Sequence, residues 1–227
     1  MDSLKVSEIF SSVQGEGPSV GRPCTFLRLA GCNLHCEWCD TRYTWDWQRY
    51  NYSENVTVMS LRSVVAQLES SERVVVTGGE PLIQASALEA LLEQLSPQTQ
   101  VEVETNGTFA PTPGLWKRVT QWNVSPKLAH AGDPESARIN WRVLRSFANN
   151  KQAWLKLVVR DRSDAEEGKK LATELAWPKL RVQLMPEART RQTLRERSRA
   201  LVPVCSSLGY RLSPRLHLEL WDGARGV

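Results

Sequence analysis

Short β-branched segments alternate with helical ones along most of this chain. The predicted strands are residues 25–29, 73–77, 101–105, 121–124, 153–159 and 180–184. The predicted helices between them are residues 60–69, 84–95, 113–120, 135–148 and 165–176, and an arginine-rich helix ending near Leu208 follows. Parallel neighbours need a crossover, and right-handed crossovers curl a sheet towards a barrel. Because eight units close such a barrel, six predict an α/β fold: an open, partial (β/α)6 TIM-like barrel.

One further strand is expected near each end of the chain. Residues 5–11 alternate weakly and predict a first strand, and residues 216–220 predict an extra edge strand. No internal repeat, low-complexity run or linker interrupts the sequence, so we expect residues 1–227 to form a single domain. No run of about eighteen apolar residues and no signal-peptide pattern is present. We therefore expect a cytoplasmic protein without a membrane segment.

Three of the five cysteines, Cys32, Cys36 and Cys39, lie within eight residues. In a reducing compartment so dense a group of thiols indicates metal binding rather than disulfides. A closed zinc site needs four protein ligands, which usually arrive as two pairs, and this chain has no second pair. A 4Fe-4S cluster on three thiolates instead leaves one iron open for chemistry. Cys24 and Cys205 stand alone, and we expect them to be small buried residues.

Polar groups directly follow four of the predicted strands. They are residues 32–41, here called the cysteine loop, and residues 77–80, 104–107 and 125–127. Parallel α/β sheets and barrels bind ligands at the carboxyl ends of their strands. We therefore expect these four groups to line one pocket. Within them the paired glycines allow close backbone approach, Ser125 and Lys127 offer a hydroxyl and a cation, and Glu104 offers an acceptor for hydroxyl groups.

The spacing of the cysteines, with three residues and then two between them, resembles the cluster motif of the radical S-adenosylmethionine (SAM) enzymes. That resemblance implies a 4Fe-4S cluster whose open iron binds the amino and carboxylate groups of SAM. A zinc knuckle completed by His35 is the alternative of a different class, and it lacks a sure fourth ligand.

Further segments narrow the resemblance to one family. They are Val13-Gln14-Gly15-Glu16-Gly17, Phe26-Leu27-Arg28-Leu29-Ala30-Gly31-Cys32, Trp38-Cys39-Asp40-Thr41, Thr77-Gly78-Gly79-Glu80-Pro81 and Ser125-Pro126-Lys127. In order and register they resemble the 7-carboxy-7-deazaguanine synthase (QueE) family. The resemblance implies conversion of 6-carboxy-5,6,7,8-tetrahydropterin to 7-carboxy-7-deazaguanine with loss of ammonia, a step towards queuosine. SAM acts there as a cofactor, because the hydrogen that its 5′-deoxyadenosyl radical takes from the pterin returns to it.

The resemblance also implies which residues hold each ligand. The substrate residues would be Val13, Gln14, Gly15, Arg28, Thr77 and His217. The SAM residues would be Trp38, Cys39, Asp40, Gly79, Ser125, Pro126, Lys127 and Gln183. The metal ligands would be Cys32, Cys36 and Cys39 for the 4Fe-4S cluster and Thr41 for Mg²⁺.

Two of these residues are informative beyond the resemblance. The charge of Arg28 lies in an otherwise apolar strand, where it is costly unless it meets an anion, and a substrate carboxylate would supply one. In the family a histidine and the terminal carboxylate close over the substrate. Ten residues follow His217 here, so the sequence departs from that pattern.

The charge pattern bears on the partners of the protein. The net charge of +4 is modest, and arginines gather between residues 189 and 199. A solvated helix face explains them, with docking of an acidic electron donor as the alternative. We expect no nucleic acid partner. The resemblance implies a reducing partner such as flavodoxin and a homodimer. The alternative function is an activase of a glycyl-radical enzyme, in which Gln14, Arg28 and Thr41 have no evident task.

Overall fold

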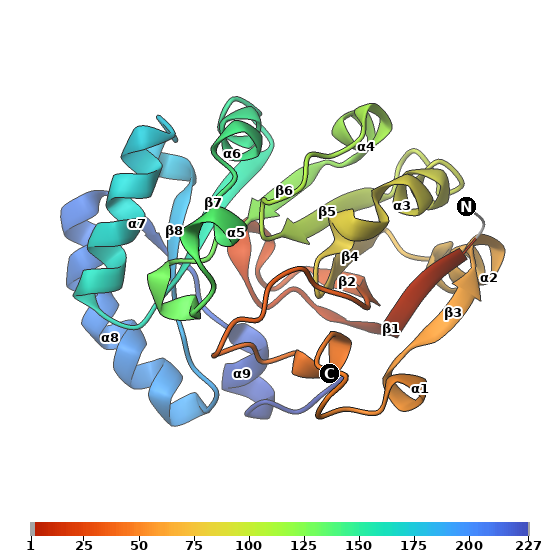
Figure 1. Ribbon diagram of the computed structural model, residues 1–227, viewed down its shortest axis with the longest axis horizontal. Coiled ribbons are helices and arrows are strands. Elements are labelled where there is room, and N and C mark those ends of the chain that lie inside the picture. The colour runs from red at the N-terminus through yellow and green to blue at the C-terminus, as the bar shows by residue number, and fades with distance from the viewer. Residues whose placement is uncertain (1–2, 227) are drawn as a thin grey trace.

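The computed structural model describes residues 3–226, and within them nine strands form one open sheet (Figure 1). Its strands are β1 (Ser3–Val13), β2 (Pro23–Leu29), β3 (Thr57–Ser60), β4 (Arg73–Gly78), β5 (Gln100–Thr105), β6 (Gln121–Val124), β7 (Ala153–Val159), β8 (Val182–Pro186) and β9 (Arg211–Leu212). The spatial order is β3-β1-β2-β4-β5-β6-β7-β8-β9. Strand β1 is antiparallel to its two neighbours, and every pairing from β2 to β9 is parallel. The open, partial barrel is confirmed.

Helices connect the parallel strands and lie outside the curved sheet (Figure 1). They are α2 (Leu61–Leu68), α3 (Ala85–Leu92), α4 (Pro113–Arg118), α6 (Trp141–Ala148), α7 (Arg162–Glu174) and α8 (Arg191–Leu208). The other described helices are α1 (Tyr52–Asn55), α5 (Glu135–Arg138) and α9 (Leu216–Trp221). The cysteine loop and the C-terminus lie on the other side of the sheet, next to α1 and α9. The hydrophobic core lies between the sheet and the outer helices, and a cavity is lined by residues of the cysteine loop and of the C-terminal residues 215–226.

The core between sheet and helices is contiguous from Leu4 to Tyr210. Its largest fully buried side chains include Trp122 of β6 and Phe147 of α6, whose ring centroids lie 5.3 Å apart in an edge-on arrangement. Such aromatic pairs add to the stabilisation that burial of their area provides. The pair holds β6 against α6 within the core.

Side-chain caps decide where several helices begin. Ser60, Thr112 and Asp161 each accept a hydrogen bond from the backbone N–H three residues later, at the starts of α2, α4 and α7. Each cap satisfies one of the free N–H groups of a first helical turn. Helix α8 ends at Gly209, whose φ of 69° is left-handed and favours glycine.

The predicted edge strand at residues 216–220 is wrong, because these residues form helix α9. The alternation of leucines there suits a strand. In the helix, Leu218 packs against Ala188 and Leu194, while Leu220 stays half exposed. The edge of the sheet is instead formed by the two residues of β9.

Two smaller differences concern residues 57–60 and 135–148. The first segment forms β3, which the sequence did not predict and which pairs with β1. The second was predicted as one helix and is two, because Asn140 is extended and caps α6 by accepting a hydrogen bond from the Val143 N–H. Within residues 3–226 no helix is long and apolar enough to cross a membrane.

Candidate active site

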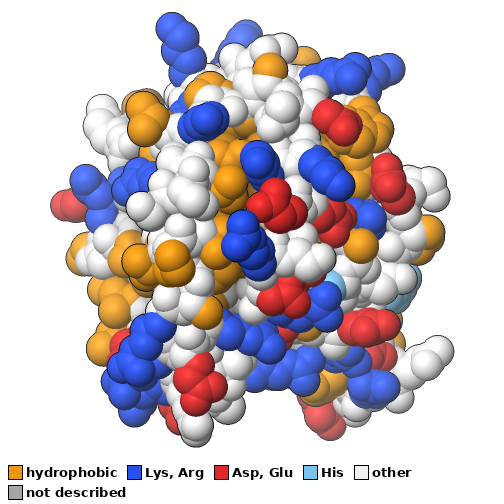
Figure 2. All heavy atoms as spheres, turned by 90° about the vertical axis from the view of Figure 1, so that its left-hand side faces the viewer, with side chains coloured by type: hydrophobic (Ala, Val, Ile, Leu, Met, Phe, Trp, Pro, Cys, Tyr) orange, Lys and Arg blue, Asp and Glu red, His pale blue; other side chains and the backbone are white. Residues whose placement is uncertain are grey.

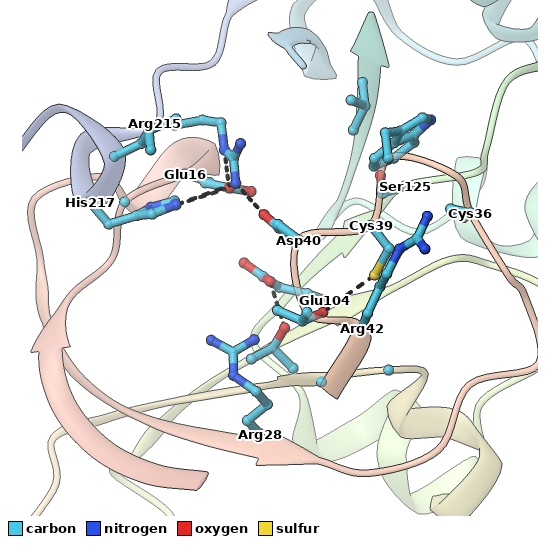
Figure 3. Close-up of a pocket in the computed structure, with 18 of the residues that line it drawn as sticks. Glu16, Arg28, Cys36, Cys39, Asp40, Arg42, Glu104, Ser125, Arg215 and His217 are labelled. Atoms are coloured by element: carbon cyan, nitrogen blue, oxygen red, sulfur yellow. Dashed lines mark hydrogen bonds and ion pairs between the residues drawn. The ribbon is translucent and has the colours of Figure 1, made fainter. Parts of the chain in front are cut away.

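A cavity of about 710 Å³ opens on the side of the sheet away from the helices, at the carboxyl ends of the parallel strands. The cysteine loop and the segments after β4, β5 and β6 all contribute to its wall, as does the turn after β1 (Figure 3). Fifteen of the residues predicted to bind a ligand line it: Val13, Gln14, Gly15, Arg28, Cys32, Cys36, Trp38, Cys39, Asp40, Thr41, Thr77, Gly79, Ser125, Lys127 and His217. Pro126 and Gln183 do not lie on this wall. Gln183 is buried in β8, and its side-chain nitrogen has no partner within the described residues.

The cysteine loop brings its three thiols together against an apolar base. Cys32 and Cys39 pack with Cys36, Leu34 and Ala131. Without a metal the thiols of Cys32 and Cys36 hold their protons, because burial raises the pKa of Cys32 to about 12 and that of Cys36 to about 11. Binding of a cluster must therefore release protons.

The donor set fits a cluster better than a single ion. Among the described residues, no three His, Cys, Asp or Glu side chains form a single-ion site. The thiolates of a 4Fe-4S cluster bind different irons, so they need not converge on one point.

Glycine is required where the segment after β4 crosses the cysteine loop. A Cβ on Gly79 would lie 2.1 Å from the Gly31 carbonyl oxygen and 3.0 Å from the Cβ of Cys32. The close approach allows the Glu80 N–H to donate to that same carbonyl at 2.8 Å. Glu80 then anchors the next segment, since its carboxylate accepts from the Asn106 N–H and the Thr105 hydroxyl. This buried carboxylate holds three walls of the cavity in register.

Glu104 is the acceptor around which the predicted polar residues gather. The Thr77 hydroxyl donates to it at 2.8 Å, and the Gln14 side-chain nitrogen donates to it at 3.2 Å. The same nitrogen donates to Glu102 at 2.7 Å, and the Gln14 oxygen accepts from the Glu16 N–H. Gln14 is almost completely buried. It therefore positions Glu104, whose carboxylate faces the cavity (Figure 3).

Arg28 extends from β2 into the cavity (Figure 3). Its Nε donates to Glu8 at 2.8 Å, which supplies the anion that the charge requires. Glu8 also accepts from Tyr43 and pairs with Arg225 of the C-terminal segment, residues 213–226. Within the described residues the terminal nitrogens of Arg28 have no hydrogen-bond partner in the protein. They are available to a ligand carboxylate.

The C-terminal segment completes the cavity despite its extra length. His217 lies against Gly15, and Gly223 to Gly226 form part of the wall. Burial lowers the pKa of His217 more than the nearby Glu16 raises it, so the imidazole is neutral. The C-terminal segment therefore reaches the cavity, with the Arg225 guanidinium 3.8 Å from the centroid of the Tyr43 ring. The terminal carboxylate belongs to Val227, which lies outside the described residues, so closure of the tail over a substrate stays a prediction.

The sequence analysis missed a buried ion network beside the cavity. Glu16 pairs with Lys156 of β7 and with Arg215, and Arg215 also pairs with Asp40 (Figure 3). Burial alone would raise the pKa of Glu16, but Lys156 and Arg215 hold it well below its usual range. Lys156 could have been found in the sequence as Arg28 was, because it too is a single charged residue in an apolar strand. No such pattern singles out Arg215.

The arginine-rich helix α8 is not a free basic face. Figure 2 shows Lys and Arg side chains mixed with acidic ones on the side of the molecule that carries α7 and α8. Arg195 pairs with Glu219 of α9, Arg197 pairs with Glu187, and Arg191 donates to the Leu220 carbonyl. These arginines fasten α9 and the loop before α8 to the helix. Docking of an acidic electron donor at this helix stays a prediction.

Replacing Gly15 by alanine tests how tightly His217 is seated. A Cβ at Gly15 would lie 2.2 Å from Nδ1 of His217 and 3.0 Å from its backbone nitrogen. We expect the ring to be displaced and the protein to lose about 1–3 kcal/mol of unfolding free energy, as for other overpacked sites. Urea denaturation measures this loss. The double variant Gly15→Ala/His217→Ala is the control: without the imidazole ring that the new Cβ would meet, the added methyl group should cost less stability. Equal stability of wild type and Gly15→Ala would contradict the contact.

Comparisons with known proteins show which family the chain belongs to. Residues 13–110 match the family model of a 4Fe-4S single cluster domain. The 7-carboxy-7-deazaguanine synthase of Pyrobaculum aerophilum is 40% identical over 98% of this chain and 97% of its own length. The 7-carboxy-7-deazaguanine synthase of Halobacterium salinarum is 35% identical over 98% of this chain and 92% of its own length. The crystal structure of QueE from Escherichia coli superposes with a TM-score of 0.70 at 26% identity, covering 95% of each chain.

A partial barrel with three cysteines in the loop after its first parallel strand defines a radical SAM enzyme with a 4Fe-4S cluster. Relatives of this similarity over nearly their whole length narrow that class further. The chain belongs to the 7-carboxy-7-deazaguanine synthase family.

Proposed function

We propose that this protein converts 6-carboxy-5,6,7,8-tetrahydropterin to 7-carboxy-7-deazaguanine with loss of ammonia, using a 4Fe-4S cluster, SAM and Mg²⁺. The observation that carries the proposal is the meeting of the three cysteines, Thr41 and Arg28 on one cavity. Family membership supports it. A glycyl-radical activase has no evident use for an arginine aimed into this cavity, and that alternative is not favoured.

The cluster and SAM supply the radical chemistry when bound, and the chain supplies position and shelter. Cys32, Cys36 and Cys39 would hold the cluster. Trp38 would lie along SAM, and the Lys127 ammonium, 5.3 Å from the centre of its indole ring, would face the anionic end. Gly79 and Ser125 line the same part of the wall. Pro126 and Gln183 remain predictions, since neither is on the wall.

The opposite part of the cavity suits a carboxylated pterin. Arg28 offers its terminal nitrogens to the carboxylate, and Glu104 offers oxygens to the N–H groups of the pterin ring. Thr77 and Gln14 orient that acceptor. The side chain of His217 and the backbone of Val13 and Gly15 would close over the ring. A substrate read by both an arginine and a carboxylate is held in one orientation, which the reaction requires.

Replacing Thr41 by alanine should raise the Mg²⁺ concentration needed for half-maximal activity by about tenfold, the value of one lost metal contact on the order of 1.4 kcal/mol. Thr41 follows Asp40 on the cavity wall, and its hydroxyl lies 3.7 Å from the Cys39 sulfur. Mg²⁺ titration of turnover makes the measurement. Thr44→Ala changes a neighbouring hydroxyl that donates to the Thr41 carbonyl and serves as control. An unchanged Mg²⁺ requirement in Thr41→Ala would place the metal elsewhere.

Turnover of the pterin tests the proposed function. The reconstituted protein is incubated anaerobically with carboxy-tetrahydropterin, SAM, dithionite and Mg²⁺, and 7-carboxy-7-deazaguanine is identified by mass spectrometry. We expect product in excess of the SAM consumed. No product from a protein that carries its cluster and cleaves SAM would overturn the assignment.

Four further features belong to this proposal. We infer a single domain, a homodimer and a reducing partner such as flavodoxin, with a cytoplasmic location that protects an oxygen-sensitive cluster. Family membership supports each of them. Chromatography with light scattering measures the oligomeric state, and a monomer would overturn the dimer.

A further inference from the structure

Arg215 connects parts of the cavity that are far apart in the sequence. It immediately precedes α9, and only 8% of its side chain is exposed. Each of its three nitrogens has its own acceptor. Nε donates to Glu16 at 3.1 Å, Nη1 donates to the Ala188 carbonyl, and Nη2 donates to Asp40 (Figure 3). One guanidinium therefore joins the turn after β1, the loop after β8 and the cysteine loop.

The two carboxylates that it joins stand at different parts of the site. Asp40 lies between Cys39 and Thr41, the residues assigned to the cluster and to Mg²⁺, and half of its side chain is exposed to the cavity. Glu16 follows Gly15 and approaches His217, with 3.8 Å between the Glu16 oxygen and the imidazole Nε2. Arg215 thus spans from the cofactor end of the cavity to the substrate end.

The charges along this connection alternate. Lys156, Glu16, Arg215 and Asp40 form three ion pairs in a row: Lys156 with Glu16, Glu16 with Arg215, and Arg215 with Asp40. Without Arg215, Glu16 would keep its pair with Lys156, whereas the ion pair of Asp40 would be lost. The strongest effect of removing Arg215 should therefore appear in the cysteine loop.

We propose that Arg215 is a positioning residue for the radical reaction: it fixes the Asp40 end of the cysteine loop relative to the substrate wall. The inference rests on the proposed function, which identifies one end of the cavity as the cofactor end and the other as the substrate end. Its geometry needs a guanidinium, because a rigid fork reaches several acceptors at once, whereas a lysine ammonium acts as a single point charge.

Hydrogen–deuterium exchange on the cluster-loaded protein tests this role without turnover. The reporters are the Thr44 and Trp45 amides, which donate to the Thr41 and Arg42 carbonyls. We expect Arg215→Gln to accelerate exchange in peptides covering residues 39–46 by about tenfold, because hydrogen bonds to charged groups are among the stronger ones. Arg215→Lys should accelerate exchange in these peptides as well, because a lysine cannot reach the three acceptors at once. Unchanged exchange in Arg215→Gln, or full recovery in Arg215→Lys, would overturn the proposal.

The matched control is Arg195→Gln. Arg195 also ties the C-terminal segment to the protein, through Glu219, but it is exposed and does not reach the cavity. Its replacement should leave the rate of hydrogen–deuterium exchange in residues 39–46 unchanged. If Arg215→Gln does not fold, Asp40→Asn removes the same ion pair from the other side and should give the same acceleration. Where both variants fold, the double variant should exchange no faster than either alone, and additive acceleration would contradict a shared contact.

A spectroscopic readout separates positioning from stability. Binding of SAM to the reduced cluster changes its electron paramagnetic resonance spectrum, and we expect Arg215→Gln to reduce that change while Arg195→Gln keeps it. A normal response in Arg215→Gln would show that Arg215 only stabilises the fold. Neither measurement depends on the pterin, so failure of the turnover assay and failure of this proposal are distinguishable.

Discussion

Replacing Cys36 by alanine should reduce the iron content of the reconstituted protein from about four per chain to less than one. Turnover should then fall to background, a loss on the order of 10⁶-fold, which is the lower end of typical enzymatic rate enhancements. The reason is that the other residues of the cavity position ligands but cannot generate a radical. Iron analysis and SAM cleavage under dithionite measure the two effects.

Cys24→Ala is the matched control for this change. Cys24 is buried like Cys36, but it packs with Phe10, Phe26 and Val75 and does not line the cavity. Its replacement creates a small void and should cost about 1 kcal/mol of stability while iron and turnover stay at the wild-type level. Full iron in Cys36→Ala, or loss of iron in Cys24→Ala, would contradict the assignment of the cluster to the cysteine loop.

Replacing Arg28 by glutamine should lower kcat/KM for the pterin by about 100-fold. A hydrogen bond to a charged group contributes roughly 1.5–3 kcal/mol, and the paired nitrogens of arginine act together on a carboxylate. Glutamine keeps polarity and much of the length but loses the charge and the fork. The pterin titration shows the effect, and SAM cleavage without pterin should be unchanged because Arg28 lies at the substrate end.

Arg73→Gln controls for the loss of a largely buried arginine near the same strands. Arg73 begins β4, beside β2, and its Nη1 lies 3.6 Å from Glu102, with no part in the cavity wall. Its replacement should change stability more than kcat/KM. Equal kcat/KM for wild type and Arg28→Gln would show that the substrate carboxylate binds elsewhere.

The alternation of strands and helices predicted the barrel because the spacing of apolar residues and the turn residues determine structure within short segments of the chain. Residues 216–220 failed for the same reason. Their leucines alternate as in a strand, and only the distant side chains of Ala188 and Leu194 decide that Leu218 is buried from a helix. β3 has little burial of its own and exists because β1 offers it an edge.

The site was largely predictable where its residues follow strands. Cysteine spacing and the positions of Thr77, Gly79 and Ser125 depend on short segments that the sequence displays. Arg215 depends on contacts with Glu16 and Asp40 across 199 and 175 residues, and no local pattern encodes such a contact.

The crystal structure of the anaerobic protein with cluster, SAM, Mg²⁺ and the carboxylated pterin tests the central claim most directly. The account predicts that the pterin carboxylate accepts hydrogen bonds from the terminal nitrogens of Arg28 and that Mg²⁺ binds the Thr41 hydroxyl. It also predicts three thiolates, from Cys32, Cys36 and Cys39, on the cluster. A pterin bound with its carboxylate away from Arg28, or a cluster held by any other set of residues, would contradict it.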